Sequence, residues 1–244
     1  MTQLPLTGQV AAVVGATSDI GRAVCQALAS AGAHPCLLGR DARTLDDVAT
    51  SLRGHNDAVH VCPVDLAVDT SVAEVVARLA RDPGRLDALI LSAGAFEMGP
   101  HVSAPVADLD RQYRTNLRGP YLLTQGLLPL LRASHGQIVF VNSTVGLEAR
   151  ATVGQYAATQ HGLRAVADAL RAEVNADGVR VLTVYLGRTA TARQARIFRM
   201  EGRPYAPELL MQPDDVAEMI LASLRLSRTA EVTEIRMRPL VKSY

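Results

Sequence analysis

The sequence VAAVVGATSDIG occupies residues 10–21. Its first part, Val10–Val14, is short and wholly apolar, which is typical of a strand covered on both faces. Gly15 follows directly, and Gly21 stands where a helical pattern begins. Glycine permits unusual backbone angles and a close approach to phosphate, and the N–H groups at a helix start bind anions. The stretch therefore predicts a strand, a phosphate-binding turn and a helix.

Short apolar runs alternate with longer amphipathic segments along the rest of the chain. The expected strands are Val10–Val14, Pro35–Leu38, Val59–Val64, Leu86–Ser92, Gln137–Asn142, Val179–Tyr185 and Glu231–Arg236. The expected helices are Ile20–Ala31, Ala42–Arg53, Ser71–Arg81, Ala107–Ala133, Gln155–Ala176 and Pro213–Leu224. Strict β-α alternation implies right-handed crossovers. We predict one α/β domain over residues 1–244, a Rossmann-like doubly wound parallel sheet of about seven strands flanked by helices.

The least regular segment covers residues 186–212. It contains Gly202, Pro204 and Pro207 together with several arginines. Loops beyond the carboxyl ends of strands border the ligand crevice of an open α/β sheet. We expect this segment to be a lid over the substrate, and the alternative is a surface excursion without a role.

Composition argues against several classes of function. Of the 244 residues, 48% are apolar, 20% charged and 4% aromatic, and the formal net charge is +1. These values give no reason to expect a nucleic-acid or membrane partner. Cys25, Cys36 and Cys62 lack ligand spacing, so we expect reduced, mostly buried thiols and no metal site. No signal peptide or membrane-spanning run is recognised, which predicts a soluble, cytoplasmic protein.

Ser143 and Tyr156 form a second informative pattern. Ser143 follows an apolar strand, and Tyr156 stands thirteen residues later at a helix start. Asn116 lies inside a long helical segment, where its poor propensity hints at a local purpose. With the glycine-rich turn, these residues resemble the short-chain dehydrogenase/reductase family over nearly the whole chain. The resemblance implies that Ser143 steadies a substrate carbonyl, that Tyr156 delivers its proton, and that Asn116 distorts its helix and holds a relay water.

The same resemblance implies a nicotinamide cofactor. Its expected contacts are Gly15, Thr17, Ser18, Asp19, Ile20, Gly21, Arg40, Asp65, Leu66, Ser92, Ala93, Gly94, Gly187, Thr189 and Thr191. Arg40 ends the second strand, where NAD-specific sites carry a carboxylate, and its guanidinium suits a 2′-phosphate. We therefore predict NADPH/NADP+. Asp65 is expected to accept from the adenine amine, and Thr189 and Thr191 to contact the carboxamide and pyrophosphate.

Four positions depart from the family pattern. Asp19 replaces the middle glycine of Gly-x-x-x-Gly-x-Gly and is expected to turn away from phosphate, toward Arg22. Ser92 replaces an asparagine, which is expected to weaken a contact within the sheet. Leu186 replaces a proline, which is expected to free the loop backbone. The fourth departure is at position 160.

Gln160 occupies the place of the family's lysine, four residues after Tyr156 on the same helix face. The resemblance implies that the lysine lowers the tyrosine pKa, binds ribose and connects the proton relay to solvent. Glutamine keeps only neutral hydrogen bonds, so Tyr156 is expected to retain a pKa of about 10 and catalysis to be slow or retuned. We expect His161 to point elsewhere on the helix and therefore not to replace the cation. Arg188 is expected to be solvated in preference to taking a catalytic role.

These residues favour an NADPH-dependent oxidoreductase that reduces the carbonyl of a small organic substrate, a ketoreductase. Two alternatives stay open: a non-redox cofactor-binding regulator or scaffold, and a non-redox pathway enzyme that uses Tyr156 as an acid in dehydration or cyclisation. The resemblance also implies a homodimer or homotetramer, assembled through the long helices. Their leucines suit either such an interface or ordinary core packing, namely Leu122, Leu123, Leu127, Leu128 and Leu131.

Overall fold

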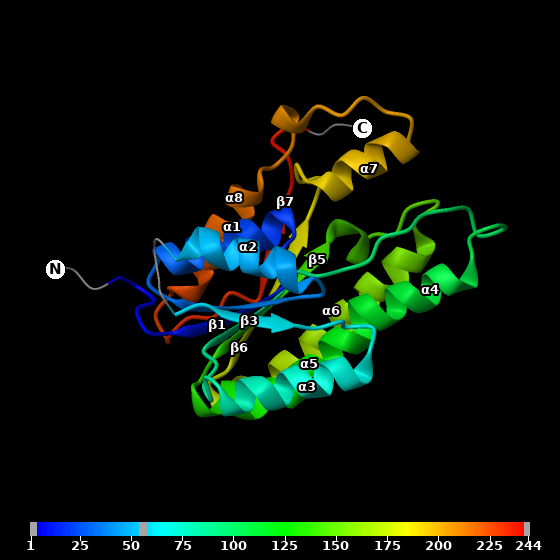
Figure 1. The fold of residues 1–244 in the computed structure, drawn as a ribbon. Helices are drawn as coiled ribbons and strands as arrows, with labels where there is room; N and C mark the ends of the chain where they lie inside the picture. The colour runs from blue at the N-terminus through cyan, green and yellow to red at the C-terminus, as the bar shows by residue number, and fades with distance from the viewer. Residues whose placement is uncertain (1–3, 54–57, 242–244) are drawn as a thin grey trace.

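A seven-stranded parallel sheet forms the centre of the molecule (Figure 1). The computed structural model describes residues 4–53 and 58–241. The strands are β1 (Val10–Val14), β2 (His34–Gly39), β3 (His60–Pro63), β4 (Ala88–Leu91), β5 (Gln137–Ser143), β6 (Arg180–Leu186) and β7 (Glu234–Met237). They pair in parallel in the order β3-β2-β1-β4-β5-β6-β7. The predicted fold class is confirmed, with strand ends shifted by a few residues.

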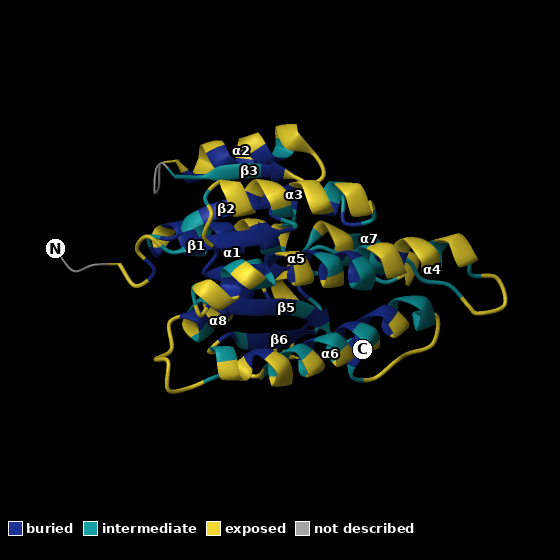
Figure 2. Cartoon of the chain, turned by 90° about the horizontal axis from the view of Figure 1, so that it is seen from below, coloured by how far each residue is buried: buried dark blue, intermediate teal, exposed yellow. Residues whose placement is uncertain are grey.

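Helices cover both faces of this sheet. They are α1 (Asp19–Ser30), α2 (Ala42–Leu52), α3 (Asp69–Arg81), α4 (Val106–Tyr113), α5 (Gly119–Ala133), α6 (Gly154–Val174), α7 (Ala192–Met200) and α8 (Pro213–Leu224). One face packs against α1, α2 and α8, and the other against α3, α5 and α6. The inner strands of the sheet are mostly buried, the edge strands β3 and β7 are partly exposed, and each helix keeps an exposed outer side (Figure 2). None of the described helices combines the length and hydrophobicity that a membrane crossing requires.

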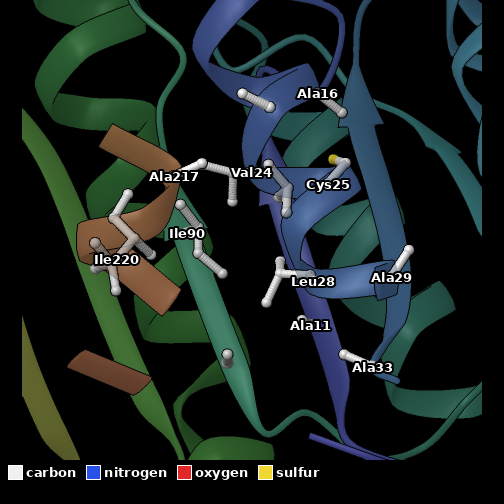
Figure 3. Close-up of a cluster of buried hydrophobic side chains, with 14 of the residues drawn as sticks. Ala11, Ala16, Val24, Cys25, Leu28, Ala29, Ala33, Ile90, Ala217 and Ile220 are labelled. Atoms are coloured by element: carbon white, nitrogen blue, oxygen red, sulfur yellow. The ribbon is translucent and has the colours of Figure 1, made fainter. Parts of the chain in front are cut away.

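Small side chains let helices approach the sheet closely on the α1–α8 face (Figure 3). Ala217 of α8 lies beside Val24 of α1, and both pack over the sheet near Ile90. On the opposite face, Leu123, Leu127 and Leu131 of α5 are fully buried. These three leucines therefore belong to the core of this chain, where each stabilises the fold by about 1.5–3 kcal/mol.

The strand order reverses between β1 and β4. β2 and β3 lie to one side of β1, while β5, β6 and β7 lie beyond β4. Connections that leave a parallel sheet in opposite directions open a crevice at the carboxyl ends of the two strands. The glycine-rich turn follows β1 and the segment 92–94 follows β4, so both border this crevice.

Two helical predictions were wrong. The expected helix Ala107–Ala133 is interrupted by a π-helical turn, Arg114–Arg118, which separates α4 from α5. The segment 186–212, expected to be irregular, contains α7, which Thr191 caps by accepting from the Gln194 N–H. α7 is polar on most sides, so apolar periodicity did not reveal it. It stands apart from both helical layers (Figure 1).

Candidate active site

A cavity of about 450 Å³ lies at the crevice. Its walls come from the turn after β1, the loop after β4, the end of β5, the start of α6 and the 186–212 segment. It brings together most of the predicted site residues: Thr17, Ser18, Asp19, Ile20, Ser92, Ala93, Gly94, Asn116, Ser143, Tyr156, Gln160, Gly187, Thr189 and Thr191. In the described part of the chain, its lining does not include Gly15, Gly21, Arg40, Asp65 or Leu66.

The glycine-rich turn is tightly closed on itself. Gly15 has a φ of 85°, and a Cβ on Gly21 would lie 2.0 Å from the Gly15 carbonyl oxygen. Ser18 caps α1, because its Oγ accepts from the Gly21 N–H at 3.1 Å and donates to the Gly15 oxygen at 2.8 Å. No side chain fits between the two glycines. The two glycines let the turn close tightly, so that Ser18, Asp19 and Ile20 at the start of α1 border the cavity. A helix N-terminus at this place fits a phosphate-bearing cofactor.

Asp19 does not contact Arg22 as expected. Its Oδ2 accepts from the Ala192 N–H at 2.9 Å, while Arg22 Nε donates to the Thr17 carbonyl at 3.0 Å. Ala192 is the first residue of α7, and a helix N-terminus attracts a carboxylate. Asp19 therefore joins the glycine-rich turn to the 186–212 segment.

Ser92 keeps β1 and β4 connected beyond their paired residues. Its Oγ donates to the Val14 carbonyl at 2.7 Å, and its backbone N–H donates to the same oxygen at 3.0 Å. Ser92 thus makes a link of its own within the sheet, at the place where a weaker contact was expected. Gly94, two residues later, also lines the cavity. A Cβ on this residue would lie 3.3 Å from Asn116 Oδ1, so the backbone and the Asn116 amide are close together here.

Tyr156 lies at the start of α6, with its ring edge-on to Phe96 and the two centroids 4.9 Å apart. Burial raises the pKa of Tyr156, and this outweighs the Arg193 charge and the hydrogen bond with Ser143, which both lower it. The expectation of an unperturbed pKa was therefore wrong, because the surrounding protein removes water that would solvate the tyrosinate. The hydroxyl is protonated at neutral pH and can donate.

Asn116 sits in the middle of the π-helical turn and is buried. Its Oδ1 accepts from the Ala95 N–H at 2.6 Å, and its Nδ2 donates to the Ala95 carbonyl at 2.8 Å. The same Nδ2 donates to Thr159 Oγ1 of α6 at 3.1 Å. The expected distortion of the helix is present, and it brings the amide between the loop after β4 and α6.

Gln160 is 4% exposed and lines the cavity with Tyr156. Its Nε2 lies 3.5 Å from Thr159 Oγ1. Its backbone carbonyl accepts from Asn142 Nδ2 at 3.0 Å, and Asn142 Oδ1 accepts from the Ser143 N–H at 2.6 Å. Asn142, which was not predicted, therefore ties the end of β5 to α6. The sequence did offer a signal for Asn142, namely a polar amide at the end of an apolar strand, directly before Ser143.

His161 and Arg188 are both engaged away from Tyr156. His161 Nδ1 is hydrogen-bonded to the Ala157 carbonyl at 2.9 Å, one turn back on α6. Arg188 is paired, where solvation was expected. Its Nη2 lies 2.9 and 2.8 Å from the two Glu201 oxygens, and its guanidinium carbon lies 4.6 Å from the Phe198 ring centroid.

Arg193 and Arg196 of α7 reach the loop after β4, and neither was predicted. Arg193 Nη2 donates to the Gly94 carbonyl, and Arg196 Nη2 donates to the Phe96 carbonyl. Arg196 also pairs with Glu97 at 3.3 Å. Residues three apart share a helix face, but their partners are about a hundred positions away in sequence, so local pattern carried no signal.

The remaining predicted cofactor contacts stay predictions. Arg40 is exposed after β2 and has no hydrogen-bond or ion-pair partner within the described residues. Asp65 Oδ1 accepts from the Ala67 N–H at 2.9 Å. Thr191 Oγ1 accepts from the Gln194 N–H at 3.1 Å, while Thr189 is buried, with its Oγ1 3.4 Å from the Gly187 carbonyl.

Residues 9–202 match the family model for short chain dehydrogenases. Over 235 residues the chain is 30% identical to an uncharacterized oxidoreductase of Staphylococcus aureus (strain USA300), covering 96% of this chain and 98% of that one. Over 241 residues it is 30% identical to glycine betaine reductase ATRR of Emericella nidulans, covering 96% of this chain and 19% of the relative. A metagenomic short-chain oxidoreductase in complex with NADP superposes with a TM-score of 0.84 at 26% identity, covering 97% of this chain and 100% of that one. The chain belongs to the short-chain dehydrogenase family.

Proposed function

We propose that the protein is an NADPH-dependent reductase of a small organic ketone or aldehyde. The observation that carries the proposal is the presence of Ser143 and Tyr156 in one cavity, which the glycine-rich turn also borders. The oxidoreductase relatives and the NADP complex of a similar structure support the same reaction class. The 186–212 segment is the lid of this site, since α7 forms one wall of the cavity.

Tyr156 acts as the proton donor. Because burial raises its pKa, its hydroxyl keeps the proton at neutral pH. Ser143 holds the substrate carbonyl oxygen close to this hydroxyl, since both residues line the same cavity. When bound, NADPH supplies the hydride for the carbonyl carbon. Proton transfer by a positioned side chain typically contributes about 10²–10⁴-fold to the rate.

Gln160 makes this reductase slow and favours reduction over oxidation. Oxidation requires tyrosinate as a base, and burial without a cation at position 160 disfavours that form. Reduction starts from neutral Tyr156, and negative charge develops on its oxygen only while the proton is being transferred to the substrate. The buried Gln160 amide can orient ribose hydroxyls by neutral hydrogen bonds.

Arg40 selects NADPH over NADH in this proposal. It is exposed at the end of β2 and free to meet a 2′-phosphate, and Gly39 before it offers no carboxylate for a ribose hydroxyl. Hydrogen bonds to charged groups contribute about 1.5–3 kcal/mol. Arg40→Ala should therefore weaken NADPH binding by roughly tenfold or more and leave NADH binding almost unchanged.

A non-redox, cofactor-binding role is the second candidate, and the neutral Gln160 beside Tyr156 is the observation that favours it. Calorimetric titration with NADPH and NADH, followed by a ketone and aldehyde screen, separates the two. NADPH binding with turnover supports the reductase. NADPH binding without turnover on any carbonyl supports the non-redox role. Absence of binding to both nucleotides contradicts both.

A further inference from the structure

We propose that Arg193 supplies the positive charge beside Tyr156 that position 160 does not, so that the active site is complete only when α7 is seated over the cavity. The inference rests on the proposed reductase function, in which Tyr156 is the proton donor. It assigns a role to a residue of α7 that lines the same cavity as Tyr156.

The Arg193 side chain extends from α7 to the loop after β4. Its Nη2 donates to the Gly94 carbonyl in the loop after β4. A Cβ on Gly94 would lie 3.7 Å from Arg193 Nη1 and 3.3 Å from Asn116 Oδ1. The guanidinium and the Asn116 amide therefore meet the same small stretch of backbone. Because Asn116 also binds Thr159 of α6, this stretch adjoins the helix that carries Tyr156.

Contacts at both ends of this region hold α7 in place. At its start, the Ala192 N–H donates to Asp19 at 2.9 Å. One turn after Arg193, Arg196 donates to the carbonyl of Phe96, whose ring packs edge-on against Tyr156. α7 is thus bound to the glycine-rich turn and to the loop beside the catalytic tyrosine. Both attachments keep Arg193 directed into the cavity.

Among the described residues, the charged side chains lining the cavity are Asp19, Arg150, Arg188, Arg193 and Glu201. Arg188 and Glu201 form an ion pair at 2.8 Å, and Asp19 binds the start of α7. Arg150 and Arg193 are both exposed, but Arg193 is bound to the Gly94 carbonyl in the loop after β4. Within this described set, Arg193 is the charge that lowers the pKa of Tyr156 against the larger effect of burial. A nearby cation favours the tyrosinate that forms as the proton leaves.

The source of the charge has a consequence for control of the reaction. A lysine at position 160 would share a rigid helix with Tyr156 and stay beside it in every state of the enzyme. Arg193 belongs to a different element, attached through Asp19, Gly94 and Phe96. The acidity of Tyr156 therefore depends on the position of α7.

Titration of Tyr156 tests the inference without any turnover. Tyrosinate absorbance is followed against pH in the wild type, Arg193→Gln, Arg193→Lys and Arg196→Gln, and the Tyr156 signal is assigned by subtracting the matching Tyr156→Phe variant. Arg193→Gln should ionise Tyr156 at a higher pH than the wild type. Arg193→Lys should shift it less. Arg196→Gln removes an attachment of α7 to the same loop but keeps the Arg193 charge, so it should shift the titration in the same direction by less than Arg193→Gln does.

Kinetics add a second, independent readout. Arg193→Gln should reduce kcat for carbonyl reduction by about tenfold or more with a smaller change in KM, because it weakens acid catalysis. Adding Gln160→Lys to Arg193→Gln should recover most of the loss. Arg196→Gln should lower kcat less than Arg193→Gln, because it loosens α7 without removing the charge beside Tyr156.

The outcomes separate this inference from the function on which it rests. A Tyr156 titration unchanged in Arg193→Gln overturns the inference, even if NADPH binds and a ketone is reduced. An equal shift in Arg193→Gln and Arg196→Gln also overturns it, because seating of α7 and not the Arg193 charge would then be responsible. Failure of NADPH to bind the wild type contradicts the reductase proposal, while the titration still decides the role of Arg193.

Discussion

The glycine-rich turn and the catalytic end of the cavity are built in opposite ways. The turn makes its decisive contacts within one short stretch, from Gly15 to Gly21, through backbone and the Ser18 hydroxyl. The catalytic end joins Tyr156 and Ser143 to groups from distant elements, including an arginine from α7. The first region is a local motif, and the second exists only in the folded chain.

This difference explains which family features each region retains. The turn requires glycines where a Cβ would strike backbone, so Gly15 and Gly21 remain, while Asp19, whose side chain binds the start of α7, replaces the middle glycine. A charge acts through space and does not need a particular attachment point. The catalytic end can therefore receive its cation from another element when position 160 is neutral. Four experiments test this comparison.

Removal of the Tyr156 hydroxyl should have the largest effect. Tyr156→Phe is expected to lower kcat for carbonyl reduction by about 10²–10⁴-fold, because the variant lacks the hydroxyl that is proposed to donate the proton. NADPH affinity measured by calorimetry should change little, since the turn is untouched. A variant that keeps more than a tenth of the wild-type rate would assign the proton to another group.

Disruption of the glycine-rich turn should weaken NADPH binding, which the Tyr156 variant leaves almost unchanged. A Cβ on Gly21 would lie 2.0 Å from the Gly15 oxygen, so Gly21→Ala should cost about 1–3 kcal/mol of stability and weaken NADPH binding by at least tenfold. Gly99→Ala is the matched control, because its Cβ would meet no atom closer than 3.5 Å. Denaturant unfolding and calorimetry measure the two effects. Equal values for both variants would contradict the steric explanation.

Restoring a lysine at the family position should accelerate the reaction. Gln160→Lys is expected to raise ketone reduction by about tenfold or more, because the new cation is closer to Tyr156 and can also bind ribose. The gain should be larger in the Arg193→Gln background, where the lysine is the sole cation beside the tyrosine. Gln160→Met, neutral and similar in size, is the control and should give no gain. Unchanged turnover would indicate that the site is adapted to different chemistry.

Removal of the Asp19 hydrogen bond, which joins the glycine-rich turn to α7, should have the smallest effect. Asp19→Ala removes the acceptor at the start of α7 and should lower stability by about 0.3–1 kcal/mol, as a charge at a helix N-terminus does. Cleavage within α7 by a protease should become faster. Asp19→Asn keeps a hydrogen-bond acceptor, so its stability and its rate of cleavage should lie between those of Asp19→Ala and the wild type. Unchanged cleavage in Asp19→Ala would mean that Asp19 does not hold α7.

Sequence reasoning predicted the sheet and most of the cavity lining because both follow from local patterns. Apolar runs of strand length gave all seven strands, and Ser143 and Tyr156 were recognised by their spacing. The helical pattern was taken as continuous through Asn116, so one long helix was expected, and only the family resemblance indicated a distortion where the structure has a π-helical turn. α7 was missed because its residues are mostly polar and its stability comes from contacts with remote loops.

The sequence by itself determined the parallel α/β sheet, the glycine-rich turn and the identity of the Ser143 and Tyr156 hydroxyls, because periodicity and spacing act between near neighbours. Only the tertiary structure decided the partner of Asp19, the engagement of Arg188 and the arrival of Arg193 beside Gly94. It also decided that burial raises the pKa of Tyr156. Burial and long-range charge depend on which distant segments meet, and that is set only when the whole chain has packed.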